Sequence, residues 1–522
     1  MTSYLIIGAG NFGAATALTL ARRGEASRIV LVDTAAFPNP RAASHDVNKI
    51  VRDDYPDKLY MRMLIKAMPK WRTDSLYSPY YHEVGMLRAD SSNFGEESMA
   101  AYRDMGVAND SEFLPVDEVR RRWNGAFATA NFDGLDKVLY NPTVGFAEAD
   151  KALGAVVQEA VDEGVEYVLG VMKHLNFGSN GACTGITLET GEVLQADKIL
   201  LATGARTAAL LAQSAPDNKQ MHAGERVVAT GAVSFYAKLY GEQKDRFASI
   251  PVLKNCLPQV KGEGMSILRD GTIKFNCDMC FTNYVTCPQT GQRMSVAPDQ
   301  NVFNVWTGPK FINFFQERAR RTIDGLYGKE VEDIAIDAYR MCWYVTSPLL
   351  LLLLLLLPRA AASPLPHRVP PFPRAGLAWP GPARPPFPFP FLSHPIPSYP
   401  IPPCLPNMPP THARTLAGLR PGPIESATLT CSRGGLDRDA STPTHDFLIT
   451  QHPHCQGLYV ATGGSFHGWK FLPVIGDYVA DMMQGSLDAD YADRWAWDKK
   501  GGDGHSANPT YQVVGDLQDW IS

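Results

Sequence analysis

The sequence predicts an α/β protein whose second domain is of the α+β class, and three features of its 522 residues support this. Short apolar runs, typical of buried parallel strands, occur near the N-terminus, near residue 200 and near residue 460. Helix-forming segments follow the first and the last of these runs. Residues 215–300, in contrast, alternate as short strands. We therefore expect a discontinuous α/β domain with a β-rich domain inserted into it.

The N-terminal segment has the pattern of a dinucleotide-binding unit. Strand, glycine-rich turn, helix and strand are expected over residues 4–7, 8–13, 14–23 and 28–32. Gly8 permits a tight turn, Gly10 lets a pyrophosphate approach the backbone, and Gly13 lets helix and strand pack closely. Asp33 follows Gly13 by 20 residues, where an acid can bond the ribose hydroxyls. The pattern predicts a Rossmann-like domain but fits FAD and NAD equally well.

The later elements of this domain follow from apolar periodicity. Helices are expected over residues 150–163 and 474–484, strands over 165–172, 198–205 and 458–464, and a hairpin over 186–194. The cofactor-binding domain is predicted to comprise residues 1–60, 145–215, 300–344 and 440–498, and the substrate domain residues 61–144 and 216–299. The remainder is an insertion, 345–439, and a C-terminal tail, 499–522.

The insertion differs in composition from the rest of the chain. It holds 23 of the 40 prolines, and it opens with nine leucines, about half of the roughly 20 residues that a membrane span needs. A proline-rich tract donates too few hydrogen bonds to join a sheet or helix, so we expect disorder. It separates residues 340–344 from 442–449, which form one motif. We interpret it as a translated, retained intron; the alternative is a surface loop.

Composition excludes some classes of function. A hydrophobic fraction of 45% and a length suited to two domains indicate a globular protein. The net charge of −5, with acidic and basic residues mixed, gives no basis for nucleic acid or membrane as partner. Nine cysteines and no secretory signal favour a reducing compartment. We expect a cytoplasmic protein; a peroxisomal one is the alternative, although the C-terminus lacks a Ser-Lys-Leu tripeptide.

Three motifs separate FAD from NAD. They are residues 41–52, residues 463–473, and the Arg-Met-Cys-Trp-Tyr run at 340–344 with its Thr-Pro continuation at 442–443. Together they resemble the flavin-dependent amine oxidases of the sarcosine oxidase and fructosyl amino acid oxidase group, within the D-amino acid oxidase family. The resemblance covers about 1–344 and 440–498. It implies FAD and oxidation of a C–N bond to an imine, with oxygen as acceptor and hydrogen peroxide as product.

The resemblance also implies roles for individual residues. Cys342 matches the cysteine that bonds the flavin through an 8α thioether, for which a thiolate is a suitable nucleophile; a buried structural cysteine is the alternative. Lys274 matches the lysine over the flavin that activates oxygen, where a cation stabilises superoxide; an exposed strand lysine is the alternative. Arg52 and Lys470 match the substrate-carboxylate clamp, with a salt bridge and a surface charge as alternatives.

The remaining predicted site residues belong to the cofactor. The complete cofactor-binding set is Gly8, Gly10, Asn11, Phe12, Gly13, Asp33, Ser44, His45, Lys49, Gly204, Cys342, Gly463, Gly464, Gly468 and Lys470. Cys277, Cys280 and Cys287 could suggest a metal site, but further ligands at suitable spacing are not evident, so we expect free cysteines and no metal.

The substrate is predicted less narrowly than the reaction. Sarcosine, L-pipecolate, saccharopine and fructosyl amino acids all fit, and the pair Arg52 and Lys470 favours a free α-carboxylate. Expected partners are a small-molecule amine and oxygen, with the protein a monomer. Two alternatives are a flavin dehydrogenase that uses another electron acceptor and a non-catalytic product disrupted by the insertion. An NAD-dependent dehydrogenase fits only the first 35 residues.

Overall fold

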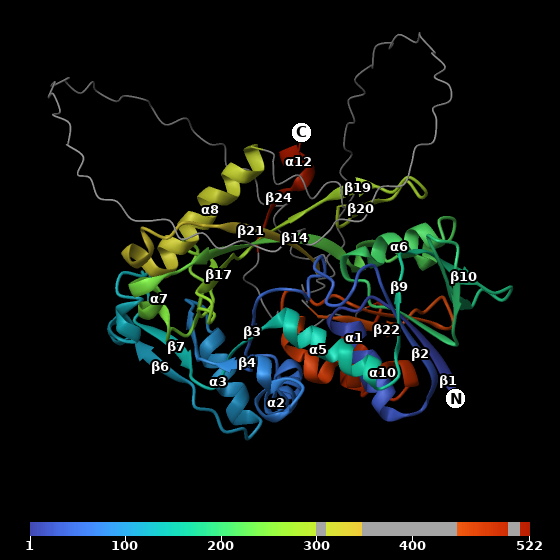
Figure 1. Ribbon diagram of the computed structural model, residues 1–522, viewed down its shortest axis with the longest axis horizontal. Coiled ribbons are helices and arrows are strands. Elements are labelled where there is room, and N and C mark those ends of the chain that lie inside the picture. Colours follow the sequence, from blue (N-terminus) through green and yellow to red (C-terminus); the bar gives the residue numbers. More distant parts are fainter. Residues whose placement is uncertain (299–308, 347–445, 499–511, 522) are drawn as a thin grey trace, which may run out of the picture. The chain divides into compact units, whose positions relative to one another are not determined.

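The computed structural model describes residues 1–298, 309–346, 446–498 and 512–521 (Figure 1). The described residues all belong to one compact unit, formed by Met1–Pro358 and Ala440–Ser522. Apart from its first two residues, the predicted insertion at 345–439 lies outside the described residues. Among the described residues, no helix is long and apolar enough to cross a membrane.

A six-stranded sheet carries the N-terminal unit. Its order is β22 (Leu448–Gln451), β23 (Leu458–Thr462), β13 (Lys198–Leu201), β1 (Thr2–Ile7), β2 (Ala26–Asp33) and β9 (Glu166–Leu169). All neighbours are parallel except β22, which is antiparallel to β23. The predicted order of strand, glycine turn, helix and strand is present, with the helix α1 at Asn11–Arg23. The predicted α/β class is confirmed.

The two faces of this sheet are covered differently. One face packs on helices α1, α2 (Lys58–Thr73), α5 (Ala149–Asp162) and α10 (Leu472–Gln484). The other packs on α6 (Thr207–Ser214) and a small sheet of β10 (Met172–Phe177), β11 (Cys183–Leu188) and β12 (Val193–Gln195). Alternating residues of β1 serve the two faces: Ile6 lies in the first core and Leu5 in the second. Helices α1 and α10 approach closely, since a Cβ on Gly476 would lie 2.2 Å from the Ala15 carbonyl oxygen.

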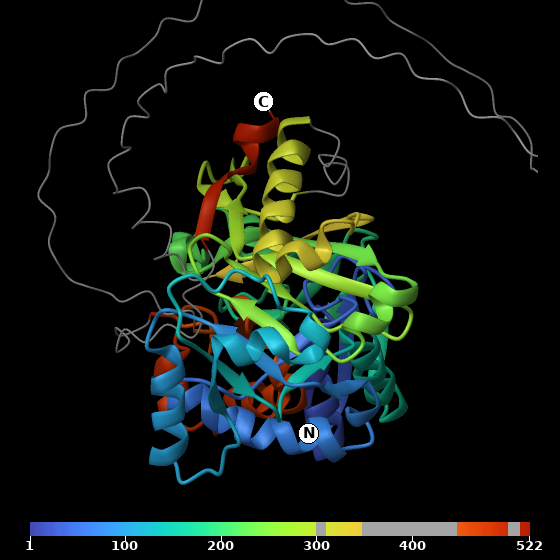
Figure 2. The same ribbon diagram turned by 90° about the vertical axis from the view of Figure 1, so that its left-hand side faces the viewer.

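A ten-stranded sheet forms the second layer. Its order is β24 (Gln512–Asp516), β18 (Met279–Thr282), β14 (Val228–Lys238), β17 (Thr272–Cys277), β16 (Gly262–Gly264), β15 (Val252–Asn255), β5 (Met86–Ala89), β7 (Lys137–Asn141) and β6 (Glu112–Pro115), and β21 (Ala338–Thr346) also pairs with β14. Helix α8 (Pro309–Tyr327) packs on it through Ile323 and Tyr327. Figures 1 and 2 show α8 (yellow) beside the C-terminal helix α12 (Leu517–Ile521, red).

Further strands and α-helices, together with short 3-10 helices, connect these layers. The strands and α-helices are β3 (Lys49–Val51), β4 (Tyr81–Glu83), β8 (Gly145–Ala147), β19 (Tyr284–Thr286), β20 (Arg293–Ser295), α3 (Phe94–Asp104), α4 (Val116–Arg121), α7 (Gly241–Phe247) and α11 (Ala489–Arg494). In the described part of residues 300–344, α8 and β21 lie on the ten-stranded sheet, and β21 pairs with β14 along nine residues.

Candidate active site

A cavity of about 700 Å³ lies where the parallel strands of the six-stranded sheet end. Its lining includes residues that directly follow β1, β2, β9, β13 and β23, which is where open α/β sheets bind ligands. The opposite lining comes from the ten-stranded sheet, through strands β5, β15, β16 and β17. The volume is within the range of about 300–1,000 Å³ that small-molecule and cofactor sites occupy.

The glycine-rich turn after β1 is shaped by backbone contacts. Gly8 has a φ of +102°, and a Cβ there would lie 2.5 Å from the carbonyl oxygen of Ala202. A Cβ on Gly13 would lie 1.9 Å from the carbonyl oxygen of Gly8. Gly10 lines the cavity beside Ser44, whose hydroxyl accepts a hydrogen bond of 3.0 Å from the backbone N–H of Asn11. Side chains are therefore excluded at Gly8 and Gly13, and the backbone of Gly8 and Gly10 borders the cavity.

Asp33 fixes the end of β2 at the cavity. Its carboxylate accepts hydrogen bonds from the backbone N–H of Ala9 at 2.7 Å, the backbone N–H of Thr34 at 2.6 Å and the side-chain amide of Asn39 at 2.6 Å. Asp33 and Asn39 both line the cavity. Asn39 was not identified from the sequence, because it lies six residues beyond the motif and has no fixed spacing.

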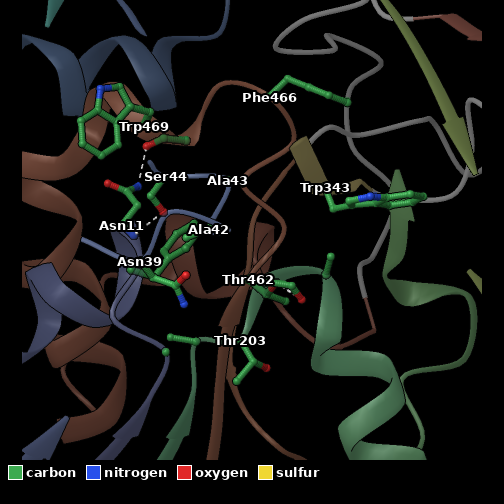
Figure 3. Close-up of a pocket in the computed structure, with 18 of the residues that line it drawn as sticks. Asn11, Asn39, Ala42, Ala43, Ser44, Thr203, Trp343, Thr462, Phe466 and Trp469 are labelled. Carbon is green, nitrogen blue, oxygen red and sulfur yellow. Dashed lines mark hydrogen bonds between the residues drawn. The ribbon is translucent and has the colours of Figure 1, made fainter. Parts of the chain in front are cut away.

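A strained turn connects β23 to α10 at the same edge. Gly463 has a φ of +79°, and the non-glycine residues Ser465 and Phe466 follow with φ values of +44° and +63°. The Ser465 hydroxyl donates to the Gly463 carbonyl at 2.8 Å. Behind this turn, the Asn11 side-chain amide donates to the Gly468 carbonyl at 2.8 Å (Figure 3). Residues far apart in sequence thus form one wall of the cavity.

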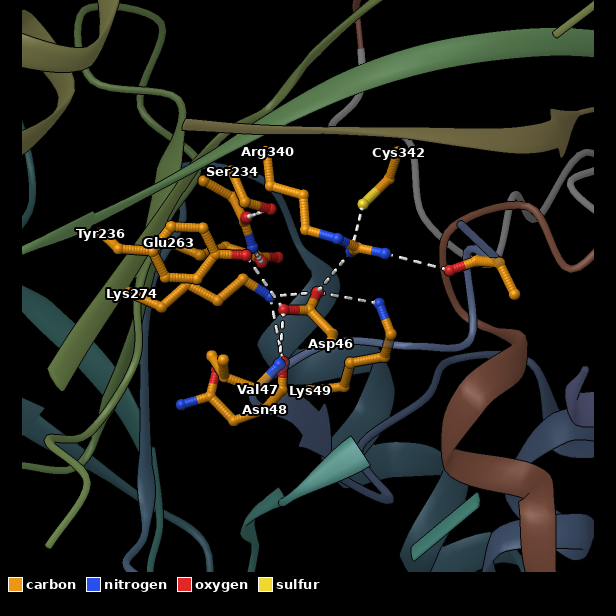
Figure 4. Close-up of polar contacts among 12 residues, drawn as sticks. Asp46, Val47, Asn48, Lys49, Ser234, Tyr236, Glu263, Lys274, Arg340 and Cys342 are labelled. Carbon is orange, nitrogen blue, oxygen red and sulfur yellow. Dashed lines mark hydrogen bonds and ion pairs between the residues drawn. The ribbon is translucent and has the colours of Figure 1, made fainter. Parts of the chain in front are cut away.

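Lys274 reaches the cavity from β17 and is 3% exposed. Its ammonium group donates to the Asp46 carboxylate at 2.7 Å and to the Asn48 carbonyl at 3.0 Å (Figure 4). Lys49 and Arg340 also face Asp46, at 3.2 and 3.7 Å. Burial alone would raise the pKa of Asp46, but the three cations hold it well below its usual value. Burial lowers the pKa of Lys274, and Asp46 opposes that shift.

Cys342 lies beside this cluster on β21. The Arg340 guanidinium donates to the Cys342 sulfur at 2.6 Å and to the Ala42 carbonyl at 3.0 Å, so it links β21 to the loop that carries Asp46. Cys342 is 2% exposed and borders the cavity through its neighbour Trp343 rather than directly. His45 is half-buried, and its pKa is lowered by burial and by Arg340.

Arg52 and Lys470 lie together in the cavity wall, 4% and 5% exposed. Arg52 forms an ion pair with Asp54 at 3.3 Å and lies over the Tyr55 ring at 4.4 Å. The Lys470 ammonium group donates to the Tyr55 hydroxyl at 2.9 Å and to the His467 carbonyl at 3.1 Å. Burial and then Arg52 lower the pKa of Lys470 well below its usual value, and both of these hydrogen-bond acceptors are neutral.

Comparison with known proteins identifies the family. The family model of FAD-dependent oxidoreductases (DAO) matches residues 3–303. The chain belongs to this family. It is 22% identical to the L-saccharopine oxidase of Schizosaccharomyces pombe over 524 residues, which cover 95% of this chain and 93% of the relative. It is 24% identical to the monomeric sarcosine oxidase of Bacillus sp. over 217 residues, which cover 40% of this chain and about half (53%) of that relative.

Solved structures share the fold. A thermally stable mutant of fructosyl peptide oxidase superposes with a TM-score of 0.69 and 21% identity, covering 99% of this chain and 98% of that one. Amadoriase I from Aspergillus fumigatus superposes with a TM-score of 0.64 and 20% identity, covering 99% and 95%.

The cavity of this FAD-dependent oxidoreductase fits the cofactor on two grounds. The glycine-lined turn leaves room for a phosphate group beside the backbone at the start of α1, where partial positive charge favours anions. In addition, the Asn11 side-chain oxygen and the Trp469 indole nitrogen have no hydrogen-bond partner among the described residues, although both side chains line the cavity. Polar groups of a bound dinucleotide would satisfy them.

Most of the residues singled out in the sequence meet at this cavity. Those that line it are Gly8, Gly10, Asn11, Phe12, Asp33, Ser44, Lys49, Arg52, Gly204, Lys274, Gly463, Gly464, Gly468 and Lys470. Gly13, His45 and Cys342 lie outside the lining. The three cysteines considered as metal ligands are free thiols, and the described residues contain no group of three His, Cys, Asp or Glu side chains that could hold a metal ion.

Four charged residues at the site were missed. Asp46 holds Lys274, while Arg88, Lys254 and Glu263 line the cavity from the ten-stranded sheet. Their signal in the sequence is weak: each is a single charged residue beside or within a short strand, and only Lys254 and Glu263 lie within ten residues of each other.

Proposed function

We propose that this chain oxidises the C–N bond of an N-substituted amino acid, using FAD and oxygen and producing an imine and hydrogen peroxide. The observation that carries the proposal is the pair of buried cations, Arg52 and Lys470, in the same cavity as the glycine-lined cofactor turn. Relatives named for saccharopine, sarcosine and fructosyl peptides support it, since those compounds carry a substituted nitrogen and a carboxylate.

Arg52 and Lys470 bind the substrate carboxylate in this proposal. Arg52 already pairs with Asp54, whereas the hydrogen-bond acceptors of Lys470 are uncharged. A carboxylate beside Lys470 would therefore favour its protonated form, so substrate binding and protonation of Lys470 are coupled. Two cations from distant parts of the chain also fix the orientation of the amine.

Lys274 supplies a fixed positive charge on the side of the cavity formed by the ten-stranded sheet. Asp46 holds the ammonium group, which keeps the charge in place in a buried environment. When bound, FAD accepts two electrons from the substrate and passes them to oxygen. The role proposed for Lys274 is to favour the step that forms negatively charged reduced oxygen. Lys274→Met should then slow reoxidation by oxygen and leave anaerobic flavin reduction largely intact, and unchanged reoxidation would exclude this role.

Cys342 is the proposed point of covalent attachment. Arg340 orients its sulfur, and the adjacent Trp343 lines the cavity. The test is the visible spectrum of the purified full-length protein before and after acid precipitation. Flavin absorbance should stay with the pellet, and should move to the supernatant in Cys342→Ser but not in the control Cys287→Ser. If acid precipitation releases flavin from the unmodified protein, no thioether joins the flavin to Cys342. If neither fraction contains flavin, the proposed function as a whole is contradicted.

Peroxide formation tests the electron acceptor. Saccharopine, sarcosine, L-pipecolate and a fructosyl amino acid are offered in turn, and hydrogen peroxide is measured against imine-derived product. One peroxide per turnover is expected. Flavin reduction without peroxide would indicate a dehydrogenase instead. We further propose a monomer in the cytoplasm, a cofactor-binding part built on the six-stranded sheet and a substrate-binding part built on the ten-stranded sheet; light scattering tests the first of these.

A further inference from the structure

Four neighbouring strands of the ten-stranded sheet carry a row of polar side chains on the cavity wall. Lys254 on β15 is in register with Arg88 on β5 and with Glu263 on β16, and Glu263 is in register with Asn276 on β17. Residues directly opposite one another on adjacent strands lie on the same face of a sheet. All four line the cavity, so one level of the sheet presents charge to a bound molecule.

Two carboxylates in this row share one cation. Lys254 is 2% exposed, and its ammonium group donates to Glu263 at 2.5 Å and to Asp278 at 2.8 Å. Asp278 is fully buried behind the row, and burial raises its pKa to about 6. Once Asp278 is ionised, Lys254, Glu263 and Asp278 together carry one excess negative charge. An uncompensated buried charge is costly, and a cation on a bound molecule would neutralise it.

Glu263 and Arg88 have capacity for a ligand. Each oxygen of Glu263 accepts one hydrogen bond, from Lys254 and from the Asn276 amide, while a carboxylate can accept about four. Arg88 uses Nε and Nη2 on one oxygen of Asp90, at 2.8 and 2.6 Å, and lies 3.5 Å from the Phe94 ring centroid. Its Nη1 makes no hydrogen bond to the described residues and is available for an anion.

We propose that Glu263 and Arg88 bind a zwitterionic end group on the nitrogen substituent of the substrate, Glu263 its ammonium and Arg88 its carboxylate. The two residues are two strand spacings apart, about 10 Å between their backbones, which suits a head with both charges on one carbon. This inference rests on the proposed function. It narrows the substrate class to amines in which one nitrogen joins two amino acids.

The neighbouring level of the sheet suits the connecting chain. Met265, two residues beyond Glu263, and Met86, two residues before Arg88, also line the cavity. Methionine side chains offer an adaptable apolar surface, against which methylene groups can pack. The backbone N–H of Met265 donates to the Lys274 carbonyl at 2.9 Å, so this apolar surface lies beside Lys274 and next to the charged row.

The test compares two amines that differ only at the far end. N-pentylglycine ends in a methyl group, whereas Nε-carboxymethyl-L-lysine carries an ammonium and a carboxylate on that carbon. With the full-length holoenzyme, kcat/KM should favour the zwitterionic amine at least tenfold. Glu263→Gln should reduce this ratio about tenfold or more, because Lys254 keeps Asp278 as its partner while the ammonium loses its counter-charge. Glu330→Gln, in an ion pair with Arg246 away from the cavity, is the control.

The outcomes separate the two proposals. Equal oxidation of both amines, or an unchanged ratio in Glu263→Gln, overturns the inference and leaves the proposed function in place. If neither amine reduces the flavin, the proposed function itself fails and the inference fails with it. A third amine, N-(5-aminopentyl)glycine, carries the ammonium alone. It should respond to Glu263→Gln but not to Arg88→Lys, whereas Nε-carboxymethyl-L-lysine should respond to both.

Discussion

The two walls of the cavity are built by different means. On the six-stranded sheet, recognition depends on the backbone: glycines without room for a Cβ, a helix start and the strand ends. On the ten-stranded sheet, it depends on buried charged side chains, such as Lys274 with Asp46 and Lys254 with Glu263. The first wall is shaped for one invariant ligand. The second fixes charge positions, which single substitutions can change, and is therefore where substrate specificity can differ between relatives.

The largest effect is expected where the backbone wall has no free space. Gly13→Ala places a Cβ 1.9 Å from the Gly8 carbonyl oxygen, so helix α1 must move away from β1 and the cofactor turn is distorted. We expect loss of bound flavin, measured as the absorbance ratio of the purified protein. Gly154→Ala in α5 is the control, because its Cβ would lie an ordinary 3.5 Å from Pro38. Full flavin content in Gly13→Ala would mean that the turn accommodates a Cβ at this position without losing the cofactor.

The clamp residues should separate activity from stability. Lys470→Met removes a cation that has neutral partners, so we expect kcat/KM to fall roughly 100-fold, while the loss of one donor to buried acceptors costs only about 1–3 kcal/mol of stability. Arg52→Met also leaves Asp54 buried without its cation, which should destabilise the fold by about 3–5 kcal/mol. Amine oxidation assays and urea unfolding, carried out on both variants, check this. Equal loss of stability in the two variants would contradict the ion pair assigned to Arg52 and Asp54.

The charged wall should depend on Asp46. Asp46→Asn leaves Lys274, Lys49 and Arg340 facing one another without a counter-charge, and we expect destabilisation by about 3–5 kcal/mol in urea unfolding. The control is Glu166→Gln, which breaks an exposed pair with Arg28 and should change stability by less than about 1 kcal/mol. Because the folded pKa of Asp46 is depressed, its contribution is present above the unfolded pKa and is lost as pH falls through the folded pKa.

The sequence predicted the first wall far better than the second. Its residues belong to contiguous motifs with fixed spacing, such as Gly8, Gly10 and Gly13, because one turn must meet one ligand. Arg88, Lys254 and Glu263 come together only when three strands pair, and no short pattern encodes that register. Each of them is a charged residue in or next to a strand that is otherwise buried, and such a residue is a weak indication of a functional site.

Two fold details depend on tertiary packing. Helix α2 was not assigned from the sequence; it continues through Pro69 because Met61, Leu64 and Trp71 are buried against the rest of the core. Residues 165–172 were expected to form one strand. The structure ends β9 at Leu169 and starts β10 at Met172, because the two pair in different sheets. Tertiary packing determines both the extent of α2 and the break between β9 and β10, and neither can be read from local propensity.

The smallest predicted effect is a shift in the pH dependence of kcat/KM. Burial and Arg52 lower the pKa of Lys470, and a substrate carboxylate needs the protonated form. The value of kcat/KM should therefore fall on the alkaline side as pH rises through the lowered pKa. Lys470→Arg keeps a positive charge at all accessible pH values, so this limb should move upward by about one pH unit or more. The same alkaline limb in both proteins would assign the titration to another group, and Lys470 would then act through geometry rather than through adjustable charge.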